Sequence, residues 1–513
     1  MIVRPPTNDG LLRRLAAGYG MQGINLAVLL SLQLLVVPIF LHFWSMQAYG
    51  RWLALNAAAG FFGLADFGVV AALGNRLRAA WSRGEAEMYR RLFQVGLGVC
   101  SGLTVAGTAL LLASASILDV SGLLGLTEEA DAETTFVLLG LMHLLGIPRA
   151  LVVSIYSARG EHGRETGVNL IYFGAMLVVP AASAGLGGGL LGTAAANLAA
   201  SVLLGWGVVL ADVRRRYADL PLRIRPPNRG ELAELVARAP FYSVTATAAL
   251  VHMQMPVVLL GLMAEPGATV AFTTMRTFTG LTRQAATQLF IVASLEMARQ
   301  HAQRDAAGIV RMYAESGRMI GGLSGLLMGM SMVLGPAFFV LWTKGAVAFD
   351  PVLAGIFLGT TLALGPSLGS TWLLRHTDHP RTLAAAFALQ IPLGAGLCVA
   401  LLAAGLGPVG AALAVGAAEL VTPGLRSVAV VGRLLEVRML TFLGPLYGTA
   451  VLSLLFGAGA ALAADWLAPP GSLSGLMVTM GLWTVLAVGP AYYLLLDARQ
   501  RTTLVCRLAR EFR

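Results

Sequence analysis

The sequence predicts an all-α polytopic membrane protein with about 14 transmembrane helices, and three observations lead to this fold class. First, 57% of the 513 residues are hydrophobic and 12% are charged, with a mean hydropathy of +0.75, whereas soluble domains are about 25% charged. Second, the chain contains about 14 apolar runs of the length, roughly 20 residues, that crosses a bilayer as a helix. Third, arginines gather in alternate connections between these runs, as they do in cytoplasmic loops.

The apolar runs give the expected spans in order. They cover residues 17–42, 51–73, 91–113, 135–157, 166–185, 189–211, 240–262, 269–296, 319–342, 352–374, 382–404, 408–431, 439–463 and 474–496. The first run follows an arginine-bearing segment and is too long for the core of a signal peptide, so we expect an uncleaved cytoplasmic end. Short turns rich in Gly, Pro and charge, such as "AEPGAT" and "LAPPGS", separate the spans.

The connections between spans predict the topology. "NRLRAAWSRGEAEMYRR" and "VRRRYADLPLRIRPPNRGELAELVARAP" hold most of the loop arginines, and residues 299–318 and 499–513 continue the pattern, whereas the alternate loops contain little beyond Arg51 and Lys344. An even number of spans with both termini in the cytoplasm fits this distribution. The net charge of +10 therefore reflects membrane topology, and we expect no nucleic-acid partner.

The longest basic loop predicts the domain organisation, because it divides the first twelve spans into two halves of six. We expect an N-terminal lobe of spans 1–6 over residues 1–213, a cytoplasmic linker over 214–238, a C-terminal lobe of spans 7–12 over 239–432, and two additional spans with a cytoplasmic tail over 433–513.

The eighth span contains two arginines in the stretch "TTMRTFTGLTRQAATQ". At the helical rise of 1.5 Å per residue, Arg276 lies roughly 10 Å and Arg283 roughly 20 Å from the outer end of the span. Each charge costs about 2.5–3.5 kcal/mol at such depths, which demands water, a partner or a ligand. Seven residues are nearly two turns, so both arginines share one face with Thr273, Gly280 and Thr287. The sequence therefore predicts a polar stripe that faces a lumen.

The alternative is that the two arginines are neutralised by acids on neighbouring helices. Asp66 in the second span and Glu419 in the twelfth are the available carboxylates, and Arg426 follows Glu419 by seven residues. Intramembrane charges of this kind either pair or mark ion pathways. Asp66, Glu419 and Arg426 are therefore also the candidates for coupling transport to H⁺ or Na⁺.

Other polar residues in the spans are candidates for lining a cavity. They are Gln22, Asn25, Gln33, Asn56, His143, His252 and Gln254. A single residue of this kind in a membrane helix usually makes an interhelical hydrogen bond. Taken together with the arginines, however, they leave an excess of cationic over acidic groups, which favours an anionic cargo, because a guanidinium offers paired donors to phosphate oxygens.

Several classes of protein are not expected. The sequence has no P-loop, HExxH or nucleophile elbow, so we expect no enzyme activity, no metal and no cofactor. A membrane glycan polymerase or ligase would need an outer domain with convergent acid–base residues, which the short outer loops lack. A scaffold that transports nothing would leave the charge of Arg276 unexplained. Gly321, Gly325 and Gly329 form GxxxGxxxG in the ninth span, which predicts close helix packing.

Three stretches resemble the bacterial O-antigen flippases and related polysaccharide exporters of the multidrug/oligosaccharidyl-lipid/polysaccharide exporter superfamily. "PIFLHFWSMQAYGRWLALNAAAGFFGLADFGVVAALGNRL" has a proline near the end of span one, "YG" at the outer turn and "DFG" before a basic loop. "MRTFTGLTRQ" and "FVLWTKGAVAFDP" look like the corresponding parts of that family around spans eight and nine. The fourteen-span layout extends the resemblance over most of the chain.

The resemblance implies two six-helix lobes around a central cavity, two C-terminal helices and alternating access. The implied cargo is an oligosaccharide on a polyprenyl pyrophosphate carrier, which is moved from the inner to the outer leaflet for surface polysaccharide biosynthesis. Arginines lining the cavity are expected to hold the pyrophosphate, and Arg276 lies where the related lipid II flippases also carry one. Asp66 is carried over only as part of "DFG", and Arg283 has no assigned counterpart.

The expected location is a bacterial cytoplasmic membrane, with membrane lipids and polysaccharide assembly proteins as further partners. The alternative is a cation-coupled multidrug antiporter of the same superfamily. Such a protein needs membrane acids to attract cationic drugs, and this chain offers Asp66 and Glu419 near such depths.

Overall fold

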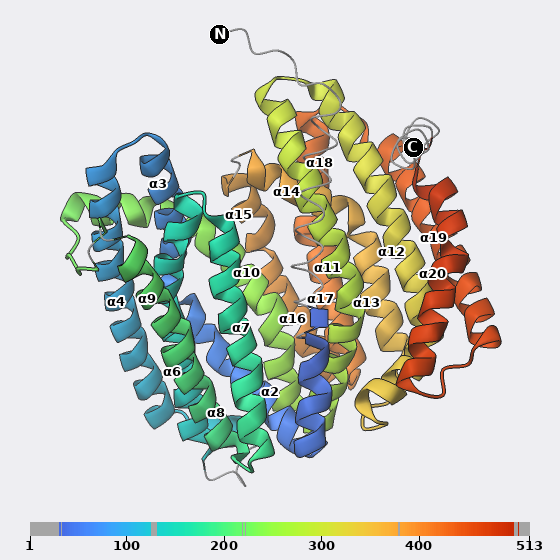
Figure 1. The fold of residues 1–513 in the computed structure, drawn as a ribbon, viewed down its shortest axis with the longest axis horizontal. Coiled ribbons are helices and arrows are strands. Elements are labelled where there is room, and N and C mark those ends of the chain that lie inside the picture. Colours follow the sequence, from blue (N-terminus) through green and yellow to red (C-terminus); the bar gives the residue numbers. More distant parts are fainter. Residues whose placement is uncertain are drawn as a thin grey trace. The chain divides into compact units, whose positions relative to one another are not determined.

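A computed structural model describes residues 30–31, 33–124, 131–217, 219–220, 222–377, 380–496 and 501. Every regular element in these residues is a helix (Figure 1). After a short apolar helix, Gln33–Phe43, they are α2 (Met46–Gly60), η1 (Phe61–Asp66), α3 (Val69–Ser82), α4 (Ala86–Ile117), α5 (Val120–Leu123), α6 (Ala132–Ala158), α7 (His162–Gly185), α8 (Gly189–Ala200), η2 (Ser201–Trp206), α9 (Gly207–Arg216), α10 (Arg229–Met263), α11 (Pro266–Ala302), α12 (Ala306–Thr343), α13 (Pro351–Ala363), α14 (Gly365–His376), α15 (Pro380–Ala388), α16 (Gln390–Ala403), α17 (Gly407–Glu419), η3 (Leu420–Gly424), α18 (Leu425–Leu434), α19 (Met439–Leu467) and α20 (Leu473–Leu495).

The predicted all-α polytopic fold class is confirmed. Among the described residues, 10 helices are long and apolar enough to cross a membrane, or up to 12 if each of two bent pairs is one span. The first predicted span contributes only the short helix Gln33–Phe43, and its earlier part lies outside the described residues. The eighth corresponds to α11, which is long enough but too polar to pass as an apolar span. The count of fourteen stays a prediction.

The chain packs as two compact units. Unit 1 comprises Met1–Pro38, Ala271–Ala386 and Ala412–Arg513, and unit 2 comprises Ile39–Val270 and Phe387–Ala411. Each unit takes segments from both predicted lobes. The division of the sequence at residues 214–238 stays a prediction.

Helix α6 is central to unit 2, where it packs against α2, α3, α4 and α8. Pro148 lies inside α6 and has no N–H for the carbonyl of Leu144. The hydroxyl of Thr104 on α4 donates to that carbonyl at 3.1 Å. The next carbonyl, of Leu145, accepts a hydrogen bond from the indole of Trp206 at 3.1 Å. Neighbouring helices therefore satisfy the polar backbone at the proline, as a membrane interior requires.

The segment between α9 and α10 is fastened to unit 2 at several points. The backbone N–H of Arg225 donates to the carbonyl of Gln94 on α4 at 3.2 Å, beside Gly98, where a side chain would overlap the Arg225 backbone. Asp219 pairs with Arg159 at 2.8 Å. We call residues 217–228 the connecting strap; the residues of it that the structure describes follow the surface of their own unit.

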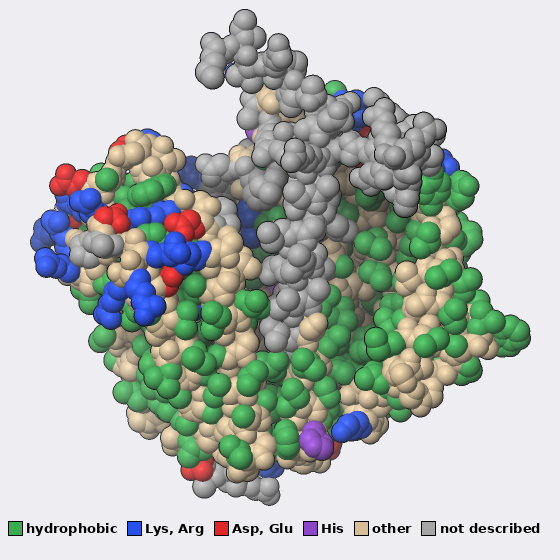
Figure 2. Space-filling view, in the orientation of Figure 1, with side chains coloured by type: hydrophobic (Ala, Val, Ile, Leu, Met, Phe, Trp, Pro, Cys, Tyr) green, Lys and Arg blue, Asp and Glu red, His purple; other side chains and the backbone are tan. Residues whose placement is uncertain are grey.

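The strap ends in a capping box at the start of α10. The Asn228 side chain accepts a hydrogen bond from the N–H of Glu231, and the Glu231 carboxylate accepts one from the N–H of Asn228, both at 2.8 Å. The hydrogen bond from the Asn228 N–H holds the pKa of the Glu231 carboxyl below its ordinary value. Partial burial raises this pKa, and Arg91, whose Nε lies 2.6 Å from the carboxylate, lowers it further. Figure 2 shows arginine side chains gathered at the end of unit 2 where α3 meets α4.

In unit 1, α12 packs closely against α19 and α20, as Figure 1 shows on its yellow-to-red side. A Cβ on Gly325 would overlap the carbonyl of Ala450, and one on Gly329 would overlap the backbone of α19. Gly321 differs, because a Cβ there would make ordinary contact with Leu446, at 3.5 Å. The predicted packing role of this glycine motif is confirmed for two of its three residues.

Candidate functional site: the polar face of helix α11

Helix α11 begins at Pro266, a residue that is tolerated in the first turn because its missing N–H needs no partner there. Its apolar side is anchored by Phe278, which lies 8% exposed between aromatic rings of α12. The ring centroid of Phe278 is 5.1 Å from that of Phe338 and 5.6 Å from that of Phe339. This packing fixes the rotation of α11 within unit 1 and so decides which side chains lie on its other face.

The predicted stripe lies largely on that other face. Arg276, Gly280, Arg283 and Thr287 are all half-buried, whereas Thr273 is buried, with 8% of its surface exposed. The Thr287 hydroxyl donates to the carbonyl of Arg283 at 2.8 Å, which is the local bond that threonine makes inside a helix. The lumen that we expect beside this face stays a prediction.

Arg276 makes a cation–π contact with an aromatic ring of its own helix. Its guanidinium carbon lies 5.2 Å from the ring centroid of Phe272, a residue with no exposed surface. A guanidinium has five N–H donors, so contact with one ring is compatible with phosphate binding at the same group.

Arg283 forms a two-bond ion pair with Glu419, one of the two carboxylates that the sequence analysis left open as partners. Nη1 donates to Oε2 at 2.8 Å, and Nη2 donates to Oε1. The Arg283 side chain is 30% exposed and that of Glu419 is 13% exposed. The pair cancels one of the two charges on the polar face of α11, because a carboxylate matches the fork of a guanidinium.

Glu419 is the last residue of α17, at an irregularity in its helix. Pro423 has no N–H for the carbonyl of Glu419 four residues earlier, and the chain passes through the π turn η3 before it continues as α18. Single π turns of this kind are frequent at functional sites. Local sequence thus explains why the helix is irregular next to the carboxylate that binds Arg283.

Gln284, which the sequence analysis did not single out, extends the polar face. Its side-chain nitrogen donates to the Oε1 of Gln33 at 2.8 Å. The indole of Trp342 on α12 donates to the carbonyl of Leu34 at 2.7 Å, so the described end of the first predicted span is held against both α11 and α12. The sequence did offer a signal for Gln284, because it is a polar residue next to Arg283 within a predicted span.

Two of the proposed coupling residues have local contacts. Arg426, on α18, is exposed and donates to the carbonyl of Ala385 at 2.9 Å. Asp66, in unit 2, accepts a hydrogen bond from the N–H of Gly68 at 3.1 Å. Phe67 and Gly68 have φ angles of 46° and 77°, so Asp66 caps the sharp turn at the bend between α2 and α3.

The remaining predicted polar residues separate into two groups in unit 2. His252 lies 3.3 Å from the side-chain nitrogen of Gln390, a buried residue of α16 that sequence reasoning missed. Gln254 and His143 instead lie beside Gly60 at the end of α2, one turn after Asn56. Gln22 and Asn25 lie outside the described residues.

Arg149 is an internal anchor. It is 6% exposed, and its Nε donates to the carbonyl of Gly205 at 3.2 Å, within the π turn η2. Its guanidinium carbon lies 3.9 Å from the ring centroid of Tyr172. The arginine therefore supplies a donor and a cation–π contact where the helix is irregular.

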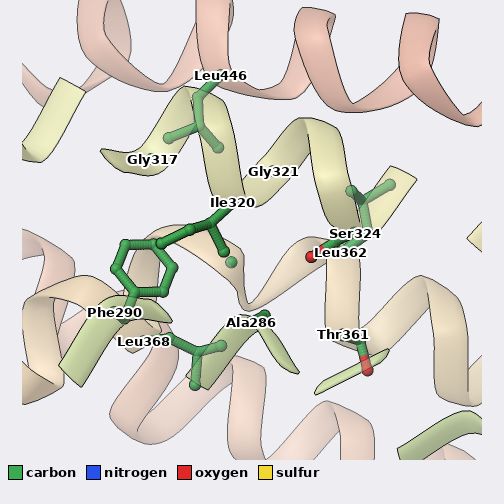
Figure 3. Close-up of a pocket in the computed structure, with 11 residues that line it drawn as sticks. Ala286, Phe290, Gly317, Ile320, Gly321, Ser324, Thr361, Leu362, Leu368 and Leu446 are labelled. Carbon is green, nitrogen blue, oxygen red and sulfur yellow. The ribbon is translucent and has the colours of Figure 1, made fainter. Parts of the chain in front are cut away.

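A small pocket, with room for about one water molecule, lies in unit 1 beside α11. Its lining carries no charge, and its polar groups are Ser324 and Thr361. Figure 3 shows Phe290, Ile320 and Leu368 toward one end of it and Ser324 with Leu362 toward the other. A space this small with an uncharged lining is not the site of the anion that the arginines favour.

No protein-family model and no curated protein matches the sequence. Solved structures match it over most of its length. An inward-facing multidrug resistance MATE family transporter of the MOP superfamily is 15% identical, with a TM-score of 0.63, over 79% of this chain and 95% of that chain. The lipid II flippase MurJ in an inward closed conformation is 12% identical, with a TM-score of 0.65, over 91% of this chain and 98% of that chain.

An outward-facing MATE family transporter of the same superfamily is 16% identical, with a TM-score of 0.53, over 83% of this chain and 96% of that chain. The structural similarity establishes the fold, but at identities this low it leaves the cargo undetermined. The chain therefore has the fold of the MATE transporters and of the flippase MurJ.

Proposed function

We propose that the chain is a flippase that moves a polyprenyl-pyrophosphate-linked oligosaccharide from the inner to the outer leaflet by alternating access, for surface polysaccharide biosynthesis. The observation that carries the proposal is the placement of Arg276 and Arg283 on one half-buried face of α11, in a chain with the fold of membrane transporters. Permanent charges at such a position are expected to serve a ligand or an ion pathway. The printed name of MurJ, a lipid II flippase, supports a lipid-linked cargo.

Arg276 is the proposed contact of the diphosphate. Its guanidinium lies beside the ring of Phe272. A guanidinium can make two parallel N–H···O bonds to phosphate oxygens, whereas a lysine would offer only a point charge.

The Arg283–Glu419 pair is the proposed coupling element. With both groups charged, the pair is neutral and Arg283 is engaged. Protonation of Glu419, or a Na⁺ ion at its carboxylate, would weaken the pair and release a positive charge for the anionic headgroup. Asp66 and Arg426 remain candidates of the same kind, but Asp66 caps a turn and Arg426 binds a backbone carbonyl.

Replacing Arg276 with Ala tests the anion-binding role. We expect export of the lipid-linked glycan to fall about tenfold or more, because one charge-assisted two-bond contact is lost, and Arg276→Lys should retain an intermediate rate. The measurement is the appearance of the glycan in the outer leaflet, normalised to protein abundance in the membrane.

Arg375→Ala is the matched control, because Arg375 also stacks on an aromatic ring of its own helix, with its guanidinium carbon 4.7 Å from the ring centroid of Trp372. This variant should export normally if the effect at Arg276 is specific. Normal export by Arg276→Ala would remove the proposed anion site.

A cation-coupled multidrug antiporter is the second candidate function, favoured by the structural likeness to MATE transporters. In that case Glu419 would attract cationic drugs. Expression of the chain should then raise resistance to organic cations, Glu419→Gln should abolish that resistance, and no lipid-linked glycan should be exported. The opposite result in both assays is expected from a flippase.

We place the flippase in a bacterial cytoplasmic membrane, with both termini in the cytoplasm and with membrane lipids and polysaccharide assembly proteins as its partners. The distribution of loop arginines supports this orientation.

A further inference from the structure

Helix α4 carries an exposed apolar stripe on the side that the other helices of unit 2 leave uncovered. Gly102, Val105 and Ala109 are exposed on it, Val105 to 70%, and their spacing of three and four residues keeps them on one face of the helix. Helices α3 and α6 pack against α4 elsewhere. Because α4 is long and apolar enough to cross a membrane, a face without protein neighbours lies against lipid.

The connecting strap crosses this same stripe nearer the start of α4. Gln94 and Gly98 precede Gly102 at intervals of four residues, so they continue the stripe. The backbone of Arg225 lies against both, because its N–H donates to the carbonyl of Gln94 at 3.2 Å and a Cβ on Gly98 would overlap its carbonyl. The strap therefore lies on the lipid-facing side of α4, and Figure 1 shows the green chain before α10 beside that helix.

The length of α4 gives the depth of this crossing. From Gly98 to the end of the helix at Ile117, nineteen residues further on, the rise is roughly 29 Å. A hydrocarbon core is about 30 Å thick. The stretch contains no charged residue, and the nearest ones in the sequence are Arg91 and Asp119. The strap therefore meets α4 at the level where hydrocarbon gives way to lipid headgroups.

The strap and the first turn of α10 bring positive charge to this level. Arg223, Arg225 and Arg229 are exposed, and none of them forms an ion pair with another residue that the structure describes. The carboxylates of Asp219 and Glu231, in the same segment, are already paired with other arginines of unit 2. Figure 2 shows arginines at this end of unit 2 next to a surface of hydrophobic side chains.

Ile224 adds an apolar group between the first two of these arginines, and it is 67% exposed. A large apolar side chain flanked by basic residues is typical of segments in the membrane interface, where it lies among the acyl chains and the charged groups reach the phosphates. A guanidinium also offers paired N–H donors that fit phosphate oxygens. Charge, exposure and depth thus agree on one kind of partner.

We propose that the connecting strap is a binding surface for anionic phospholipids such as phosphatidylglycerol. Arg223 and Arg225 bind the headgroup phosphates, and Ile224 inserts among the acyl chains beside α4. In the expected topology these lipids belong to the cytoplasmic leaflet, whose negative surface potential adds to the attraction. The surface lies within unit 2 and is independent of the cargo that the chain transports.

A fluorescent reporter on the strap tests this surface. In the full chain with Cys506→Ser and Ile224→Cys, bimane is attached at residue 224, because Cys100 and Cys398 are buried. The protein is reconstituted in vesicles of phosphatidylcholine and phosphatidylglycerol, and acyl-brominated forms of either lipid serve as quenchers. We expect both to quench the bimane, with a preference of about tenfold or more for phosphatidylglycerol, since each arginine near a membrane surface contributes about fivefold.

Arg223→Gln with Arg225→Gln should remove most of this preference, a loss of about tenfold. NaCl at about 1 M should also lower it, because the screening length falls to roughly 3 Å. The matched control is Arg78→Gln with Arg83→Gln, which removes the same charge near the turn between α3 and α4, where both arginines are exposed and have side-chain partners. The control should change the preference by less than about twofold.

Each other outcome overturns part of the proposal. Equal quenching by the two lipids, with the strap arginines intact, removes the anionic preference. An absence of quenching by either lipid places the strap in water and removes the surface. An equal loss in the control pair assigns the preference to overall charge and not to Arg223 and Arg225. If a small fraction of farnesyl diphosphate displaces phosphatidylglycerol, the surface is a site for a diphosphate carrier and the phospholipid assignment fails.

Discussion

At the residue scale, the structure chooses between two partners that the sequence left open. The charge of Arg283 in an apolar stretch predicts a partner or a ligand, and the sequence offers Asp66 and Glu419 as carboxylates. Glu419 is 136 residues from Arg283 along the chain, and only the tertiary fold brings the two side chains together. Local sequence patterns do not show which residues so far apart in the sequence come into contact. The sequence could therefore suggest Glu419 as a partner of Arg283 but could not assign it.

The ion pair gives a prediction about stability. Glu419→Ala should lower the free energy of unfolding by about 2–3 kcal/mol, below the 3–5 kcal/mol of a fully buried pair, because Arg283 keeps 30% of its side chain exposed. The double variant Arg283→Met with Glu419→Leu should recover most of that loss, because no charge is left without its partner. Thermal unfolding in detergent measures both, and a double variant that is less stable than Glu419→Ala would contradict the account.

The convergence of His143 and Gln254 beside Gly60 could not be predicted from the sequence for a different reason. The chain has 61 glycines, and most need no explanation beyond helix packing or turns. What distinguishes Gly60 is the pair of nitrogens contributed by α6 and α10, which no local pattern around residue 60 indicates. His143 and Gln254 were visible as polar residues in apolar runs, but their convergence was not.

At the element scale, the glycine spacing in α12 was informative because helix packing follows a simple period. Residues four apart lie on one face, and small residues there let two backbones approach. The same reasoning could not say which helix approaches. The structure assigns α19, where Gly457 in turn lies against the backbone of Leu326.

Gly329→Ala should therefore destabilise the contact between α12 and α19. Its Cβ would overlap the backbone of Leu454 and Ala458, and overpacking of this kind lowers stability by about 1–3 kcal/mol. Gly448→Ala, on α19, is the control: its Cβ has no neighbour within 4 Å, so stability should stay unchanged or rise slightly. Melting temperatures in detergent compare the two, and equal values would argue against close backbone contact at Gly329.

At the scale of the whole molecule, composition and the lengths of the apolar runs were sufficient for the fold class. Ten to twelve of the expected spans appear as apolar helices in the described residues. The polar face of α11 lowers the hydropathy of this helix, so α11 is not counted as an apolar span. The same polar face makes it the candidate site. The grouping of segments into units, by contrast, joins residues far apart in sequence, which no run-by-run reading could supply.

The expected topology is testable over the whole chain. In a background with Cys506 replaced by Ser, Glu85→Cys lies between α3 and α4 and Ala346→Cys lies after α12, both at exposed positions, whereas Cys100 and Cys398 are buried. A membrane-impermeant maleimide added to intact cells should label Ala346→Cys, and Glu85→Cys should react only after the membrane is opened. Labelling of both from one side would contradict the orientation that the arginines predict.

The connecting strap has a consequence for engineering. Asp219 and Arg225 of the strap are bonded to Arg159 and to Gln94 of unit 2, and Glu231, just beyond the strap, pairs with Arg91. This connection therefore has little slack for inserted sequence. A reporter domain or epitope tag placed there would have to detach the polypeptide from α4 before it could be accommodated.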